Sequence, residues 1–193
     1  MNLADGEKLY MYGTEFVNDS NYYHYFDLKG KIKVSGSLVA LNSGASLSRS
    51  YQYCKLFYES AGLIDASELK FPNKLSESCF WHVFGRCTSL TKIPPALPST
   101  KLQWGCYSSM FEGCKSLTSI PENFLPATDL NYNCYFNMFA WCTSLTTVPE
   151  NLLPATTLDS YCYWNMFKGC KALTKAPTLP ALTLKEMCYS NMF

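Results

Sequence analysis

The sequence predicts an α/β repeat fold, a solenoid with short strands on one face and helices on the other, preceded by a small β-rich N-terminal cap. Two observations predict it. A unit of 26 to 28 residues recurs along most of the chain, and its proline- and cysteine-rich composition is missing from the first fifty residues. All ten prolines lie at or after Pro72, and nine of the ten cysteines lie at or after Cys79. The predicted domains are a cap at 1–50 and a solenoid of about five units at 51–193.

A phenylalanine marks each unit. The anchors are Phe84, Phe111, Phe139, Phe167 and Phe193, separated by 27, 28, 28 and 26 residues. A degenerate earlier unit runs through Phe57 and has Ser60 where later units have a cysteine. Differences in length fall between the two prolines of each unit, for example Pro121 and Pro126, which predicts a loop because loops absorb insertions. Stacked units should align phenylalanine on phenylalanine, since no unit can bury its apolar face alone.

Each unit is predicted to contain a helix followed by a short strand. In the fourth full unit the apolar positions suit one side of a helix with 3.6 residues per turn. They are Leu158, Cys162, Tyr163, Met166, Phe167 and Cys170. Gly113 and Gly169 lie near the predicted helix ends, although Arg86 and Trp141 occupy the same position in other units. Residues 117–121 and 145–149 are predicted to be strands that end at a proline.

The N-terminal cap is predicted from alternating polar and apolar residues at 8–12 and 31–34. A net charge of +1, with 16% charged residues, gives no electrostatic basis for binding nucleic acid or a membrane surface. Residues 1–7 have neither the basic nor the apolar region of a signal peptide, and no stretch is apolar for long enough to span a membrane. The composition is that of a globular chain.

The cysteines fall into two columns, meaning positions that recur from unit to unit. The first column is Cys79, Cys106, Cys134, Cys162 and Cys188, and the second is Cys87, Cys114, Cys142 and Cys170; Cys54 stands apart. Eight residues of helix would separate the two thiols of a unit by about 12 Å. A disulfide needs Cα atoms within about 7 Å. We therefore expect free, buried thiols that act as small apolar side chains.

No catalytic or metal-binding pattern is present. The chain has two histidines, His24 and His82, in different regions, and it contains no C-x-x-C, P-loop, G-x-S-x-G or H-E-x-x-H sequence. We expect no metal, no cofactor and no catalytic residues, so the protein is predicted not to be an enzyme.

Two sets of residues are candidates for ligand binding. The first is a set of aromatic residues at variable positions on the border of the buried arc: Trp81, Trp104, Tyr132, Phe136 and Trp164. They predict a semi-exposed aromatic surface for protein or glycan contact, with packing between neighbouring helices as the alternative. The second is a threonine column on the strand side: Thr91, Thr118, Thr146 and Thr174. Either this column is a recognition surface, or threonine occurs there because it is generally favoured in strands.

The order Met-Phe-x-Gly-Cys-x-Ser-Leu-Thr-x-x-Pro, followed by Leu-Pro-Ala-Thr and Cys-Tyr, runs from Met110 to Tyr135 and recurs through 51–193. It resembles the BspA-type leucine-rich repeats of bacterial surface proteins, which have relatives encoded by phages. Residues 6–13 and 30–36 resemble the β-rich segment that often precedes such repeats. The resemblance implies a leucine-rich-repeat solenoid on the cell surface or outside the cell.

The function implied by the resemblance is a non-catalytic recognition or adhesion module that binds a protein or glycan on a host or neighbouring cell. The alternative is a structural spacer, or a receptor-binding part, of a larger surface or virion protein. The last unit stops at Phe193, so the solenoid is expected to be a C-terminally truncated fragment. Its open end is expected to expose apolar residues and to favour end-to-end association. These residues are Leu173, Leu184, Cys188, Tyr189, Met192 and Phe193.

Overall fold

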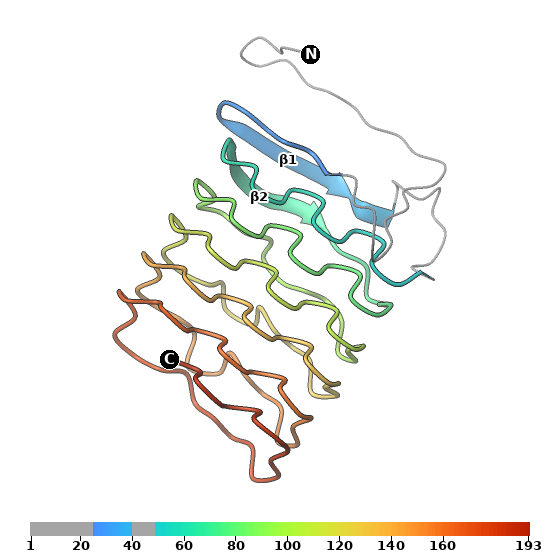
Figure 1. Ribbon diagram of the computed structural model, residues 1–193, viewed down its shortest axis with the longest axis vertical. Coiled ribbons are helices and arrows are strands. Elements are labelled where there is room, and N and C mark those ends of the chain that lie inside the picture. Colours follow the sequence, from blue (N-terminus) through green and yellow to red (C-terminus); the bar gives the residue numbers. More distant parts are fainter. Residues whose placement is uncertain (1–24, 40–48) are drawn as a thin grey trace.

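The computed structural model describes residues 25–39 and 49–193 (Figure 1). Its two strands, β1 (Ile32–Ser37) and β2 (Leu63–Lys70), form one small parallel sheet. The only helical residues in the described ranges are the two of a short 3₁₀ turn at 38–39. The predicted α/β leucine-rich-repeat solenoid, with short strands on one face and helices on the other, is therefore wrong. No helix in these ranges is long and apolar enough to cross a membrane.

The segments predicted as helices are runs of overlapping β-turns. In one of them the N–H of Val83 donates to the carbonyl of Phe80 over 3.2 Å, and the N–H of Cys87 donates to that of Phe84 over 3.1 Å. These bonds join residues three apart, where an α-helix joins residues four apart. We call these segments the turn wall; its ranges are 51–60, 77–87, 104–114, 132–142, 160–170 and 186–193.

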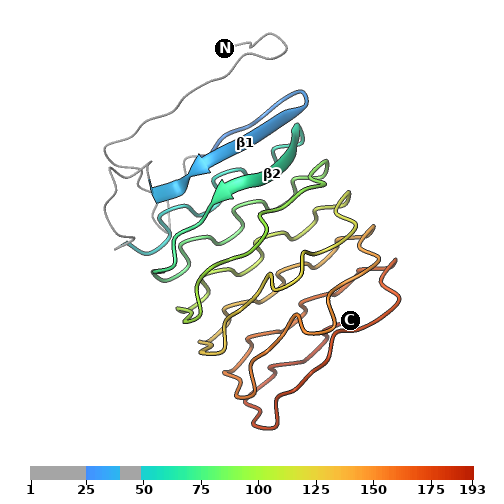
Figure 2. The ribbon, with the colours of Figure 1, turned by 180° about the vertical axis from the view of Figure 1, so that it is seen from behind.

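The turn wall lacks helices because half of its N–H groups bond to another segment. From Tyr51 to Phe167, the remaining N–H groups, on alternate residues, each donate to a carbonyl of the next turn-wall segment. For example, Phe84 donates to Met110 over 3.0 Å, and Phe111 donates to Met138 over 2.9 Å. The chain thus runs in successive circuits, each lying against the next, as Figures 1 and 2 show. In a helix, the same N–H groups would donate to carbonyls of their own segment.

Every fourth residue of the turn wall has a positive φ. In one circuit these residues are Asn133, Asn137 and Trp141, with φ of 60°, 53° and 62°. Glycine and asparagine tolerate this conformation best. For other residues it costs about 1 to 2 kcal/mol of stability each. Gly169, at φ 75°, has a second reason to be glycine, because a Cβ there would lie 2.4 Å from the Trp141 ring.

Two ladders of aromatic rings fill the core behind the turn wall. The phenylalanine ladder consists of Phe57, Phe84, Phe111, Phe139, Phe167 and Phe193, with ring centroids 5.3 to 5.8 Å apart. The parallel ladder consists of Tyr53, Phe80, Tyr107, Tyr135, Tyr163 and Tyr189. The predicted contact of phenylalanine on phenylalanine is confirmed, although β-turns carry the rings where helices were expected.

The opposite side of each circuit has little regular structure beyond β2. We call it the bridge wall, with ranges 63–70, 90–103, 117–130, 145–158 and 173–183. The strands predicted at 117–121 and 145–149 are reduced to one isolated bridge between Ser119 and Thr147. The predicted loops between prolines are partly core, since Phe124 is fully buried and its ring lies 5.9 Å from that of Phe111.

The described part of the N-terminal region packs as a first layer on the stack. Phe26 contacts the ring of Phe57 at 5.8 Å, and β1 pairs with β2. The strand predicted at 31–34 is confirmed by β1. The segments predicted at 8–12 and around 6–13, together with His24, lie outside the described residues.

Candidate functional site

Four of the five predicted aromatic residues belong to one chain of ring contacts. Trp104 and Tyr132 are stacked, with centroids 6.3 Å apart and planes 12° from parallel. Phe136 and Trp164 are in tilted contact at 5.2 Å. Tyr161, which the sequence analysis did not single out, joins the two pairs, at 5.2 Å from Tyr132 and 5.1 Å from Trp164. We call these five residues the aromatic strip.

The turn wall positions the strip across three consecutive circuits. Trp104 and Tyr132 occupy the same place in their circuits, each directly before a residue with positive φ. The side chains of Trp104 and Tyr132 are 38% and 40% exposed, whereas Phe136 and Trp164 are half-buried. The proposed exposure therefore holds for one pair, and packing between circuits accounts for much of the other.

Tyr161 has a conformation unusual for an aromatic residue. Its φ is 60°, and it occupies the column held by Gly105 and Asn133 in the two preceding circuits. Its hydroxyl donates to Glu186 Oε1 over 2.7 Å, a hydrogen bond that raises the pKa of Tyr161. Other residues that are neither glycine nor asparagine fill this column elsewhere, as Tyr51 and Met187 do, so no sequence signal singles out Tyr161.

The rim of the strip, meaning the polar residues bonded to it or close to it in the chain, carries two carboxylates and one lysine. Besides Glu186 it includes Asp159, which pairs with Lys185 over 3.1 Å, and Asn131, whose Oδ1 accepts the Tyr132 N–H over 2.8 Å. The strip thus combines ring surfaces with carboxylate and amide groups, which bind hydroxyl and N–H donors.

Trp81, the fifth predicted aromatic residue, belongs to a different cluster. Its ring contacts Tyr51 at 6.3 Å and His82 at 5.0 Å, and Lys55 Nζ lies 5.1 Å from its centroid. Arg86 lies over the neighbouring Tyr58 ring at 5.7 Å. Cations over aromatic faces stabilise this part of the turn wall, which supports a packing role for Trp81.

The threonine column is exposed on the bridge wall, but its hydroxyls are largely engaged in the fold. The Thr91 hydroxyl donates to the carbonyl of Ile64 over 3.0 Å, and that of Thr146 donates to Thr118 over 3.0 Å. Thr174 makes a longer contact of 3.5 Å with the Thr146 carbonyl. Each bond connects neighbouring circuits, so the column serves the stack at least as directly as it could serve a ligand.

All ten cysteines are free and buried, as predicted. The helix on which that prediction rested is absent, but the second column has a role of its own. Each of its thiols donates to the carbonyl of the anchor phenylalanine one circuit earlier, as Cys142 does to Phe111 over 3.2 Å. Ser60, which aligns with this column, makes the same kind of bond to Phe26. Burial raises the pKa of the Cys79 and Cys87 thiols to about 12, so thiolate is scarce.

The described residues offer little that resembles a catalytic centre. No group of three or more metal-ligating side chains occurs within 25–39 and 49–193. His82 is mostly buried, and that burial, with the charges of Lys55 and Arg86, lowers its pKa to about 4. Glu112 lies 3.7 Å from His82 Nε2.

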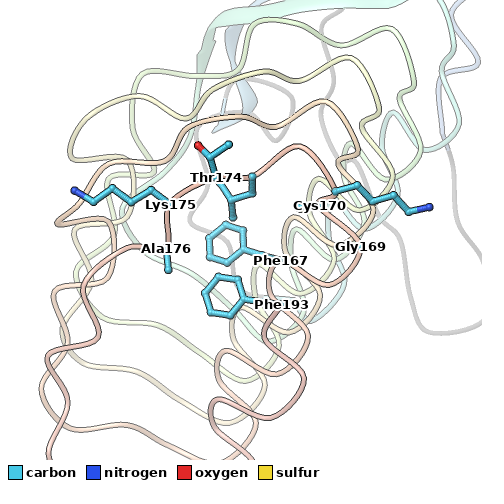
Figure 3. Close-up of a pocket in the computed structure, with 9 residues that line it drawn as sticks. Phe167, Gly169, Cys170, Thr174, Lys175, Ala176 and Phe193 are labelled. Carbon is cyan, nitrogen blue, oxygen red and sulfur yellow. The ribbon is translucent and has the colours of Figure 1, made fainter.

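A pocket of about 260 Å³ lies at the last circuit, where the rings of Phe167 and Phe193 face one another (Figure 3). Its other lining includes Cys170 and Leu173, with Lys171 and Lys175 beside it. Of the residues expected to be exposed there, Leu184 and Phe193 are exposed, Leu173 and Tyr189 are half-buried, and Cys188 and Met192 are buried. End-to-end association through this surface stays a prediction.

Comparison of the chain with protein-family models, with curated proteins and with solved structures found no match in any of the three. The resemblance to BspA-type repeats therefore stays an expectation from the sequence, and the argument for function depends on the aromatic strip.

Proposed function

We propose that this protein is a non-catalytic recognition or adhesion module that acts outside the cell or at its surface and binds its ligand through the aromatic strip. One observation carries the proposal. Trp104 and Tyr132 stack on each other and remain more than a third exposed, whereas the ladder rings of the same circuits are fully buried. Large aromatic side chains with an exposed edge are typical of binding surfaces because they bury much area at little entropic cost.

The alternative is a structural spacer in a larger surface or virion protein. The regular bonds between circuits and the two ring ladders favour a stiff rod, which suits that role. A spacer, however, gives no reason for exposing a stacked tryptophan and tyrosine, so we favour recognition.

An extracellular location has to be reconciled with ten free cysteines, since oxidising compartments favour disulfides. The reactive form of cysteine is the thiolate. Because burial raises the thiol pKa values, as at Cys54 and Cys162 to about 12, the folded protein would resist oxidation. The thiols are thus compatible with the proposed location.

The test measures the binding of fluorescently labelled protein to a panel of bacterial and epithelial cells. It compares the wild type with a strip variant and a control variant. The double variant Trp104→Ala/Tyr132→Ala should lose binding. Trp141→Ala is the matched control, because Trp141 is also exposed, at 46%, but contacts Gly169 outside the strip. Binding that is equal in all three proteins, or absent from every cell type, would argue against recognition through the strip.

A further inference from the structure

We propose that the ligand of the aromatic strip is a neutral glycan chain that lies along the strip, parallel to the direction in which the circuits stack. This inference rests on the proposed function and specifies its ligand. Three features carry it: the spacing of the rings, the chemistry of the rim and the charge of the surroundings.

The spacing of the rings follows the spacing of the circuits. Trp104, Tyr132 and Tyr161 come from three successive circuits, with centroid separations of 6.3 and 5.2 Å. This is close to the length of one sugar ring in an extended polysaccharide, so consecutive sugars can each lie against the exposed edge of one aromatic residue. The C–H faces of a pyranose are apolar and pack against aromatic rings, while its hydroxyls remain at the edge.

The rim supplies partners for those hydroxyls. Glu186 accepts the Tyr161 hydroxyl over 2.7 Å, and a carboxylate has further lone pairs with which to accept. Asn131 directly precedes Tyr132 in the chain, and Asp159 lies two residues before Tyr161. Carboxylates and amides can bind two neighbouring hydroxyls at once, which fixes the orientation of a sugar that the rings alone would let slide.

The charge of the rim selects against polyanions. Lys185 is the basic residue at the rim, and it is paired with Asp159 at 3.1 Å. Polyanions such as nucleic acids and heparin bind through uncompensated Lys or Arg side chains. The acidic rim would repel them, whereas a neutral chain meets no such penalty.

The shape of the strip favours a narrow ligand over a protein. A stable protein interface buries about 800 Å² on each partner around a broad apolar centre. Only two rings of the strip are more than a third exposed, Trp104 and Tyr132, and the other three are half-buried, which is too little apolar surface for such a centre. A protein ligand is the competing outcome of the test.

The test is electrophoresis in native gels that contain yeast mannan, barley β-glucan, plant galactan or, as a polyanion, heparin. At least one neutral polysaccharide should retard the protein and heparin should not. Trp104→Ala/Tyr132→Ala should weaken that binding at least tenfold, and Trp141→Ala should leave it unchanged. Tyr161→Asn should fold normally, because asparagine already occupies the equivalent position at Asn133, and it should weaken binding about tenfold.

Failure of all three neutral polysaccharides, retardation by heparin, or retention by the double variant would overturn the glycan proposal. Cell binding separates this failure from failure of the proposed function. Binding that depends on the strip, survives periodate oxidation of the cells and is lost after protease treatment identifies a protein ligand, so that only the glycan proposal fails. Binding that does not depend on the strip overturns both.

Discussion

The turn wall and the bridge wall join the same circuits in different ways. On the turn wall every second N–H donates to the next circuit, and all these bonds run in one sense, as from Tyr107 to Cys134 over 3.1 Å. On the bridge wall the bonds are scattered and run in both senses: Ala66 donates forward to Lys92, and Thr146 donates back to Thr118. One wall is thus held by its backbone, and the other by a few bridges, side-chain bonds and ion pairs.

The difference explains where sequence variation is tolerated. Both ladders and both cysteine columns belong to the turn wall, where each side chain must fit directly against its counterpart one circuit away. The bridge wall accepts the differences in length between the prolines. We therefore expect mutations on the turn wall to cost more stability than mutations of similar size on the bridge wall.

The largest effect is expected at the centre of the phenylalanine ladder. Phe139 is fully buried, and its ring lies 5.5 Å from that of Phe111 and 5.8 Å from that of Phe167. Phe139→Ala should lower the free energy of unfolding by about 3 to 5 kcal/mol, measured by urea denaturation. Phe136→Ala is the control on the half-buried strip and should cost clearly less. Equal losses would place Phe136 in the core and weaken the case for the strip.

The turn wall shows most clearly which structural features could be predicted from the sequence. The anchor phenylalanines, the burial of the cysteines and the equivalence of Ser60 to a cysteine all follow from aligning the units, because contacts between circuits depend on which residues recur. The helices did not form. Buried pairs such as Cys79-Phe80 and Val83-Phe84 suit a period of 3.6 almost as well as a period of 4.

The signal that distinguishes the two periods is the column of residues with positive φ. Asn133 and Asn137 stand four residues apart and Gly105 and Gly113 stand eight apart, a spacing that a helix does not require and a run of β-turns does. The candidate site was predicted in part for the same reason. Tyr161 fills one of these positions, and its role depends on a contact with Glu186 in the next circuit, which the residues of its own unit do not reveal.

A second effect on the turn wall should depend on pH. The pKa of His82 is lowered to about 4, mainly by burial and then by Lys55 and Arg86, so the folded protein keeps it neutral. The unfolded chain takes up this proton at about pH 6.5, so stability should fall as the pH drops from there to about 4, by about 3 kcal/mol in all. Below about pH 4 the histidine contributes no further loss.

His82→Asn isolates this contribution. Asparagine suits the φ of 53° at this position and occurs in the same column at Asn137 and Asn165. Urea denaturation at about pH 7 and pH 4.5 should show a smaller acid-induced loss in the variant, because the carboxylates titrate equally in both proteins. An identical loss in the two proteins would mean that His82 is protonated in the folded state, paired with Glu112.

A serine substitution should lower the free energy of unfolding by about 1 to 3 kcal/mol more in the first cysteine column than in the second. Cys142→Ser should be nearly neutral, because the hydroxyl can donate to the Phe111 carbonyl as Ser60 donates to Phe26. Cys134→Ser should be destabilising. Backbone N–H groups bond to the Cys134 sulfur, but no carbonyl of the described chain accepts from a thiol of the first column, so the serine O–H would lack an acceptor. Thermal unfolding of both variants under reducing conditions measures the difference, and equal melting temperatures would show that the columns are interchangeable.

The smallest effect is expected on the bridge wall. Lys175 Nζ lies 3.2 Å from Glu150 Oε2 and joins two circuits, but both side chains are largely exposed. Water screens such a pair, and ordering two long side chains costs entropy, so Lys175→Ala should change the free energy of unfolding by less than about 1 kcal/mol. The measurement is urea denaturation at low and high salt, with Lys115→Ala, another exposed lysine, as the control. A loss as large as that of Phe139→Ala would mean that ion pairs hold the bridge wall as firmly as the backbone holds the turn wall, and the contrast between the two walls would be wrong.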